Sequence, residues 1–171
     1  MNGPVLSPWP TGRVADATDR QARPLLDQAG IADLVPHAGS MCLLQALLAW
    51  DEASIRCSAI SHRSPDNPLR CARGLLATAA IEYAGQAMAL HGALLARASG
   101  GAMRPGMLAS ARSVEFSRWR LDDLPGELLV SAERLAGDER QILYRFDLVH
   151  AGESVARGRA AVVLDLGGVA R

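Results

Sequence analysis

The stretch from Gly74 to Ala98 constrains this chain more than any other, because it is long, almost wholly apolar and carries a single carboxylate, Glu82. Its length and composition predict one long helix buried in the core. An ionised carboxylate is rarely buried without a partner, because taking its charge out of water is costly. Glu82 therefore either faces solvent at the edge of a core helix or belongs to a functional site.

The neighbours of Glu82 around the helix form a small, polar face, which fits either of these two positions. At about 100° per residue, small and polar residues lie within roughly 60° of Glu82, namely Thr78, Gly85, Gln86 and Ala89. The larger apolar residues are expected to point elsewhere, namely Ile81, Met88 and Leu95. A small, polar face around a carboxylate is typical of the wall of a cleft.

Composition narrows the class of protein. The chain has 171 residues, of which 49% are hydrophobic and 21% charged, as expected for one soluble globular domain. The 18 basic residues balance the 18 acidic ones, which argues against binding to nucleic acid or to a membrane surface. All the basic residues are arginine, so a lysine-based mechanism is excluded.

Cysteine usage and the absence of leader-like segments indicate a cytoplasmic protein. The three cysteines are widely spaced and show no metal-ligand pairing, namely Cys42, Cys57 and Cys71. The N-terminus is not followed by a leader-like apolar segment, and we find no run long enough to span a bilayer. Since metal and nucleotide motifs are also lacking, we expect no cofactor.

The order of elements predicts an α+β fold. Residues 1–24 are expected to form an extended arm, and residues 25–171 a single domain. A short helix is expected over 25–34, and strands over 41–50, 54–60, 107–119, 127–135, 141–150 and 154–166. A run of strands after a single long helix indicates an antiparallel sheet wrapped around that helix.

Four segments carry a resemblance to a known family. They are IADLVPHAGSMCLLQALLAWD, SIRCSAISHRSPDNPL, IEYAGQAMALHG and SARSVEFSRWRLDDLPGELLVSAE, which together span roughly residues 28–166. In order and spacing they resemble the β-hydroxyacyl-acyl carrier protein dehydratases, which have the hot-dog fold. The combination of PHAGSM, PDNPL and IEYAGQAMA is most similar to the dehydratase-like proteins of bacterial aryl-polyene biosynthesis.

The resemblance implies a reaction and a set of site residues. The reaction is loss of water from a 3-hydroxyacyl thioester on an acyl carrier protein, giving a trans-2-enoyl thioester. The catalytic acid of the family corresponds to Glu82, and its glutamine four residues later to Gln86, which is a candidate for binding the substrate carbonyl or for hydrogen-bonding Glu82. An oxyanion on the thioester carbonyl is usually held by backbone N–H groups at a helix N-terminus, here near Gly74. Asn67, in the loop before the helix, is a further candidate for binding substrate or for orienting that loop.

The second catalytic group is less directly indicated. The family carries a His-Phe-Pro-Gly turn before the central helix, whereas this chain has PDNPLRCARG, without histidine. We rank His37 first as the partner of Glu82, because it lies in the first matching motif, where the resembled family also carries a histidine. His62 is ranked second, and the pair is expected within the chain or across a dimer interface. His91 lies about 180° around the helix from Glu82 and cannot meet it within one chain. His150, at a strand end, is expected at the surface.

Three functions remain open from the sequence. The chain is expected to be a dehydratase, a non-catalytic hot-dog subunit of a heteromeric dehydratase, or a hot-dog acyl thioesterase. A homo- or heterodimer with another hot-dog subunit is expected, because a lone sheet leaves an edge strand exposed. Two groups of arginines suit docking of an acidic carrier protein, or are solvated surface charge: Arg63, Arg70 and Arg73, and Arg112, Arg118 and Arg120. The length and the aromatic or aliphatic nature of the acyl group are not specified.

Overall fold

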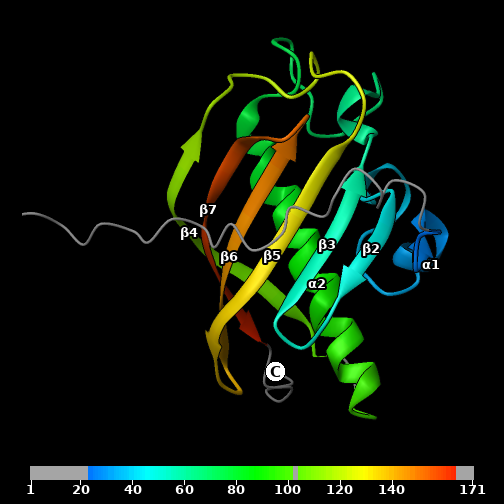
Figure 1. The fold of residues 1–171 in the computed structure, drawn as a ribbon, viewed down its shortest axis with the longest axis vertical. Helices are drawn as coiled ribbons and strands as arrows, with labels where there is room; N and C mark the ends of the chain where they lie inside the picture. Colours follow the sequence, from blue (N-terminus) through cyan, green and yellow to red (C-terminus); the bar gives the residue numbers. More distant parts are fainter. Residues whose placement is uncertain (1–22, 102–103, 165–171) are drawn as a thin grey trace, which may run out of the picture.

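A computed structural model describes residues 23–101 and 104–164 as one sheet wrapped around one long helix (Figure 1). The arm expected over residues 1–24 lies, up to residue 22, outside the described residues. The strands are β1 (Leu26–Asp27), β2 (Ala46–Trp50), β3 (Ser54–Ala59), β4 (Gly106–Phe116), β5 (Leu128–Gly137), β6 (Gln141–His150) and β7 (Glu153–Leu164). The α-helices are α1 (Gln28–Ala32) and α2 (Ala80–Ala98).

The seven strands form a single sheet in the order β1-β2-β3-β5-β6-β7-β4, and every neighbouring pair is antiparallel. Helix α2 packs against β3, β5 and β6, and Figure 1 shows it running along one face of the curved sheet. The predicted α+β architecture, an antiparallel sheet wrapped around one long central helix, is thereby confirmed. Among the described residues, no helix is long and apolar enough to cross a membrane.

The core lies between α2 and the concave face of the sheet. Strand β6 has the bounds expected from the sequence, and every second residue along it is buried, namely Ile142, Tyr144, Phe146 and Leu148. From the helix side, Tyr83 and Leu90 are completely buried. The core therefore depends on one helix face and one sheet face, and it leaves the side of α2 that carries Glu82 partly exposed.

Strand β4 forms one edge of the sheet and is hydrogen-bonded only to β7 within the described chain. Most of its residues are exposed, and several are large and apolar. Met107 is 74% exposed, and Trp119, just beyond the strand, is 91% exposed. An exposed, apolar edge strand is a surface that proteins normally cover.

The long helix begins later than its sequence predicts. The apolar run from Gly74 suggested a helix from that residue, but α2 starts at Ala80 after a 3₁₀ turn over Ala77–Ala79. The preceding residues bond instead to a distant segment: Leu121 donates its N–H to the carbonyl of Leu75 at 2.9 Å, and Ala77 donates to that of Trp119 at 2.9 Å. These long-range bonds hold the chain extended before the helix.

The region before β2 also differs in detail from its prediction. The expected helix over 25–34 is split into β1, which pairs with β2, and the five-residue helix α1. The Asp27 carboxylate caps α1 by accepting the N–H of Gly30 at 3.0 Å. A 3₁₀ turn over Gly39–Met41 precedes β2, which begins at Ala46 and not at residue 41 as expected.

Candidate functional site

Glu82 and His37 lie side by side within one chain. Glu82 is in the first turn of α2, and His37 lies in the loop before the 3₁₀ turn at Gly39–Met41. The Nε2 atom of His37 is 3.1 Å from Oε1 of Glu82. The two side chains are 26% and 35% exposed, so the pair is partly shielded but reachable from solvent. A carboxylate and an imidazole at this distance can share and transfer a proton.

Gln86 holds Glu82 to the segment that leads from His37. Its Nε2 donates to Glu82 Oε1 at 3.0 Å and to the Met41 carbonyl at 2.7 Å. Its Oε1 accepts the N–H of Leu43 at 2.9 Å. Gln86 is only 1% exposed. The side chain placed by wheel geometry on the open face of Glu82 is therefore buried, and it orients the carboxylate instead of facing a cleft.

An open groove of about 450 Å³ runs beside Glu82. It is lined by Leu69, Cys71, Leu76, Thr78, Ala79, Ile81 and Glu82. The prediction that Ile81 points away from the Glu82 face is wrong, because the start of α2 lies at the surface and exposes both residues to the same groove. The walls are mainly apolar with a carboxylate and a hydroxyl, a composition that suits an acyl chain with a polar reacting end.

Asn67 is buried inside the loop before the helix and holds this loop together by hydrogen bonds. It is 6% exposed, and its Nδ2 donates to the Ser61 carbonyl and to the Tyr83 hydroxyl, both at 3.0 Å. Its Oδ1 accepts the N–H of Leu69 at 2.9 Å. With these contacts made, Asn67 shapes the groove wall through Leu69. This matches the loop-orienting alternative considered for Asn67 and leaves its side chain no direct access to a substrate.

Gly74 belongs to a tight turn and not to the helix N-terminus. Its N–H is donated to the Cys71 carbonyl at 2.9 Å, so the oxyanion role suggested for this N–H is not supported. Its φ of +94° is accessible mainly to glycine. A Cβ here would lie 2.7 Å from both Arg120 Nη2 and Asp122 Oδ2. Glycine is needed at this position because the backbone conformation and the close approach both exclude a side chain.

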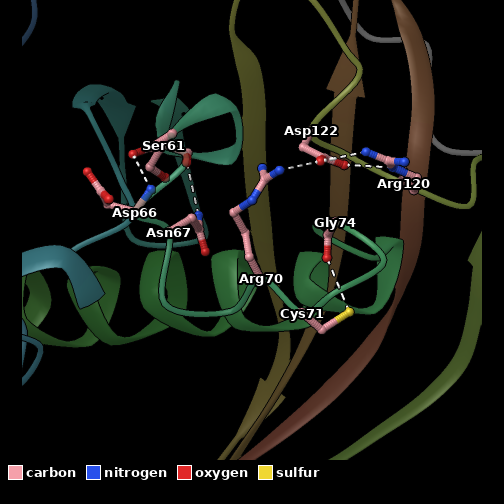
Figure 2. A network of polar contacts seen from close by, with 9 residues as sticks. Ser61, Asp66, Asn67, Arg70, Cys71, Gly74, Arg120 and Asp122 are labelled. Atoms are coloured by element: carbon pink, nitrogen blue, oxygen red, sulfur yellow. Dashed lines mark hydrogen bonds and ion pairs between the residues drawn. The ribbon is translucent and has the colours of Figure 1, made fainter.

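Two arginines from distant segments share one carboxylate near the groove (Figure 2). The Nη2 atoms of Arg70 and Arg120 each lie 2.8 Å from Asp122 Oδ2, and Arg120 Nε donates to Oδ1 at 3.0 Å. The Asp122 side chain is 3% exposed, and the hydrogen bonds from Arg120 lower its pKa to about 2. One arginine from each of the two groups noted in the sequence, Arg70 and Arg120, thus meets the other at Asp122.

The other buried histidines are engaged elsewhere. His62 is completely buried, its Nε2 lies 3.2 Å from the Leu124 carbonyl, and burial lowers its pKa. His91 bonds through Nδ1 to the Tyr144 hydroxyl at 3.0 Å and through Nε2 to the Asp51 carbonyl at 2.8 Å. Burial lowers the pKa of His91 as well. Within this chain His37 is thus the histidine next to Glu82, and the second-ranked His62 is not.

Metal-binding side chains do not gather at this site. Within residues 23–101 and 104–164, no three His, Cys, Asp or Glu side chains form a group that could hold a metal ion. All three cysteines are free thiols, and Cys71 is the exposed one, on the groove wall.

Comparisons with solved structures agree on the fold. A chain of the dehydratase heterocomplex ApeI:P from Xenorhabdus doucetiae superposes with a TM-score of 0.72 at 20% identity, covering 80% of this chain and 91% of that one. A hypothetical thioesterase with coenzyme A from Streptococcus pneumoniae TIGR4 gives 0.51 at 12% identity, with coverage of 70% and 84%. A mutant thioesterase from Staphylococcus aureus gives 0.53 at 13% identity, with coverage of 70% and 92%. At these identities the likeness establishes the hot-dog fold.

The family is established from the sequence. A search of curated proteins finds no match. The family model of the ApeP dehydratase, ApeP-like, matches residues 29–165, which include His37, the groove-lining loop, Glu82 and the whole sheet from β2 onward. This confirms the resemblance to aryl-polyene dehydratase-like proteins, and the chain belongs to the ApeP-like dehydratase family.

Proposed function

We propose that this chain takes part in the dehydration of 3-hydroxyacyl thioesters carried on an acyl carrier protein, with Glu82 and His37 as its acid–base pair. The observation that carries the proposal is the 3.1 Å approach of His37 Nε2 to Glu82 Oε1 beside an apolar groove. Membership of a dehydratase family supports the reaction class.

The reaction needs one group to take a proton and another to give one. A base removes a proton from C2 of the thioester, and the electron pair left behind forms the C2=C3 bond. The C3–O bond breaks, and the hydroxyl leaves as water after protonation by an acid. The adjacent imidazole and carboxylate can supply both functions without a cofactor. Gln86 holds the carboxylate in place through its 3.0 Å bond to Oε1.

Mass spectrometry of the carrier-bound product tests this proposal. Purified wild type, Glu82→Ala and His37→Ala are incubated with a 3-hydroxyacyl thioester on its carrier protein. Glu139→Ala is the matched control, because Glu139 is exposed in the turn between β5 and β6. Loss of one water with wild type and the control, but with neither site variant, supports the pair. A free acid and free thiol would instead reveal a thioesterase, and turnover that survives both substitutions would refute the assignment.

A second hot-dog subunit is a proposed partner, because the chain by itself leaves an open groove and an apolar edge. Strand β4 has one unpaired side, and Trp119 beside it is 91% exposed. The structural relative from Xenorhabdus doucetiae is a dehydratase heterocomplex. A partner strand along β4 would extend the sheet and cover Met107, which is 74% exposed.

Measurement of mass in solution separates the assembly states. The chain alone and the chain co-expressed with a second hot-dog dehydratase subunit are compared by light scattering, each as wild type and as Trp119→Ala. Activity and a dimer mass that require the second subunit support the heteromeric alternative, and an active dimer of this chain alone supports the homomeric one. A monomer that dehydrates at full rate would overturn the need for any partner.

The proposed carrier-protein surface lies at the arginines around the groove. Arg73 is exposed in the turn beside Cys71, and it makes no ion pair within the described residues. Arg70 and Arg120 share Asp122 and so keep a net positive charge between them. Acyl carrier proteins are acidic, so this surface offers charge complementarity.

Charge reversal tests this surface. Arg73→Glu is expected to raise KM for the carrier-bound substrate about tenfold at low salt, with kcat little changed. Arg97→Glu is the control, because Arg97 is also exposed but lies in the last turn of α2, at the opposite end from Glu82. Equal effects of the two substitutions would show that the surface around Arg73 is not the docking site.

A further inference from the structure

A chain of hydrogen bonds links the loop around Asn67 to the backbone of Leu43. Asn67 Nδ2 donates to the Tyr83 hydroxyl at 3.0 Å, that hydroxyl lies 2.8 Å from Ser61 Oγ, and Ser61 Oγ donates to the Leu43 carbonyl at 2.7 Å. The single hydroxyl proton of Ser61 goes to Leu43, so Ser61 must accept from Tyr83. The direction of each bond is thereby fixed. Figure 2 shows Asn67 beside Ser61, joined by the separate bond from Asn67 Nδ2 to the Ser61 carbonyl.

The peptide N–H of Leu43 extends this series of hydrogen bonds toward Glu82. The N–H of Leu43 is donated to Gln86 Oε1 at 2.9 Å, and Gln86 Nε2 donates to Glu82 Oε1 at 3.0 Å. The second hydrogen of that amide goes to the Met41 carbonyl at 2.7 Å. A flipped Gln86 amide would place N–H against N–H at Leu43, so this side chain has one satisfactory orientation.

Burial makes this network specific. Tyr83 and Leu43 are 0% exposed, Gln86 is 1% and Asn67 is 6%. Ser61, which joins Tyr83 to Leu43, is partly exposed. At the buried residues water cannot readily replace a lost partner, so a polar group that loses its bond there is left unsatisfied. The network therefore has one well-satisfied arrangement, in which the groove-wall loop, the segment after His37 and the Glu82 carboxylate are all held together.

We infer that Tyr83 and Asn67 are positioning residues for Glu82, acting through Ser61, the Leu43 peptide groups and Gln86. The inference rests on the proposed acid–base role of Glu82 and His37. Tyr83 follows Glu82 directly along α2, but its hydroxyl bonds to Ser61 and Asn67, and neither the Tyr83 nor the Asn67 side chain is hydrogen-bonded to Glu82 or His37. They hold Leu43 where Gln86 can bind both it and the carboxylate, and they hold Leu69 at the wall of the groove.

The chain offers a matched control in Tyr144. Tyr144 is as buried as Tyr83, at 1% exposed, and its hydroxyl lies 3.0 Å from His91 Nδ1. That histidine bonds onward to the Asp51 carbonyl, away from Glu82. Tyr83→Phe and Tyr144→Phe each remove one buried, bonded hydroxyl from the core. A purely structural role predicts the same consequences for both variants.

Kinetics distinguish the two roles. For Tyr83→Phe we expect kcat to fall about tenfold with KM changed less than about twofold, because a small displacement of a catalytic group slows chemistry more than binding. For Tyr144→Phe we expect kcat and KM within about twofold of wild type. Ser61→Ala should behave like Tyr83→Phe, and Ser61→Thr, which retains the hydroxyl, should restore most of the lost kcat. Equal kcat in the two tyrosine variants would overturn the inference.

A readout that needs no turnover separates this inference from the proposed function. The imidazole signals of the four histidines are recorded by NMR, and that of His37 is assigned by its loss in His37→Gln. Tyr83→Phe should shift the His37 signal and leave His150 unmoved, whereas Tyr144→Phe should not shift His37. If wild type dehydrates nothing but this pattern holds, the positioning network stands and the proposed function fails. If the His37 signal is unchanged in Tyr83→Phe, the positioning role is wrong whatever the activity.

Discussion

Substitution of Gly74 by alanine tests the reason for glycine beside the groove. Gly74 has a φ of +94° and closes a turn in which it exchanges two backbone hydrogen bonds with Cys71. A Cβ added there would lie 2.7 Å from Arg120 Nη2 and 2.7 Å from Asp122 Oδ2. Two separate penalties therefore apply, one from the backbone and one from the displaced ion pair.

The two penalties can be estimated. Placing an L-residue in the left-handed region costs about 1–2 kcal/mol. Moving the Arg120 guanidinium away from the almost completely buried Asp122 carboxylate costs about 1 kcal/mol more, since Arg120 itself is 46% exposed and can reach water. We therefore expect Gly74→Ala to lower the free energy of unfolding by about 2–3 kcal/mol.

Two other glycines separate these contributions. Gly126 has a φ of +79° but open space around an added Cβ, so Gly126→Ala should show the backbone penalty alone, about 1–2 kcal/mol. Gly92 lies inside α2 with open space and a helical conformation, so Gly92→Ala should raise stability by about 0.5–1 kcal/mol. Urea denaturation followed by circular dichroism measures all three free energies.

The order of stability among the three glycine variants tests this reasoning. If Gly74→Ala is no more destabilising than Gly126→Ala, the close approach to Arg120 and Asp122 contributes nothing. If Gly74→Ala keeps its stability but loses turnover, the Gly74 backbone serves the substrate directly, as the sequence suggested, and its description as a turn glycine is incomplete.

Two further predictions concern charge and thiols. The pKa of Asp122 is lowered to about 2 from its ordinary 3.8 by its bonds with Arg120. Its stabilising contribution is therefore complete above about pH 4 and is lost as the pH falls toward 2, so wild type should lose about 1–2 kcal/mol more than Asp122→Asn between pH 5 and 2 in urea titrations. Parallel losses in the two proteins would contradict this. In native protein a thiol reagent should modify one cysteine of three, the exposed Cys71, because Cys42 is buried and burial raises the pKa of Cys57 to about 12. Rapid reaction of a second thiol before unfolding would be inconsistent with the core.

The sheet and the existence of the long helix could be predicted because their signals are local. Alternation in Gln141–His150 identifies the buried face of β6, and this strand has the predicted bounds. The start of α2 could not be predicted in the same way. Leu75 and Ala77 suit a helix or an extended segment equally well, and their conformation is set by hydrogen bonds to Leu121 and Trp119, more than 40 residues away.

The candidate site depends even more on contacts between distant segments. His37 and Glu82 are 45 residues apart, and only the family resemblance, not periodicity, ranked His37 first. The burial of Gln86 follows from the segment around Met41 lying over the helix, which wheel geometry for an isolated helix does not include. The role of Asp122 could not be predicted for the same reason. One of its arginine partners, Arg70, precedes the long helix in the sequence, and the other, Arg120, follows it.

The side chain and the backbone carbonyl of Trp119 lie in different surroundings. Its side chain is 91% exposed beside the free edge of β4, while its backbone carbonyl accepts the N–H of Ala77 at the start of the turn that leads into α2. The next residue along that wall, Thr78, lines the groove. In the proposed assembly, a partner that covers this indole would therefore contact the residue whose carbonyl fixes the start of the groove wall. The free edge of the sheet and the groove beside Glu82 thus share one short backbone segment.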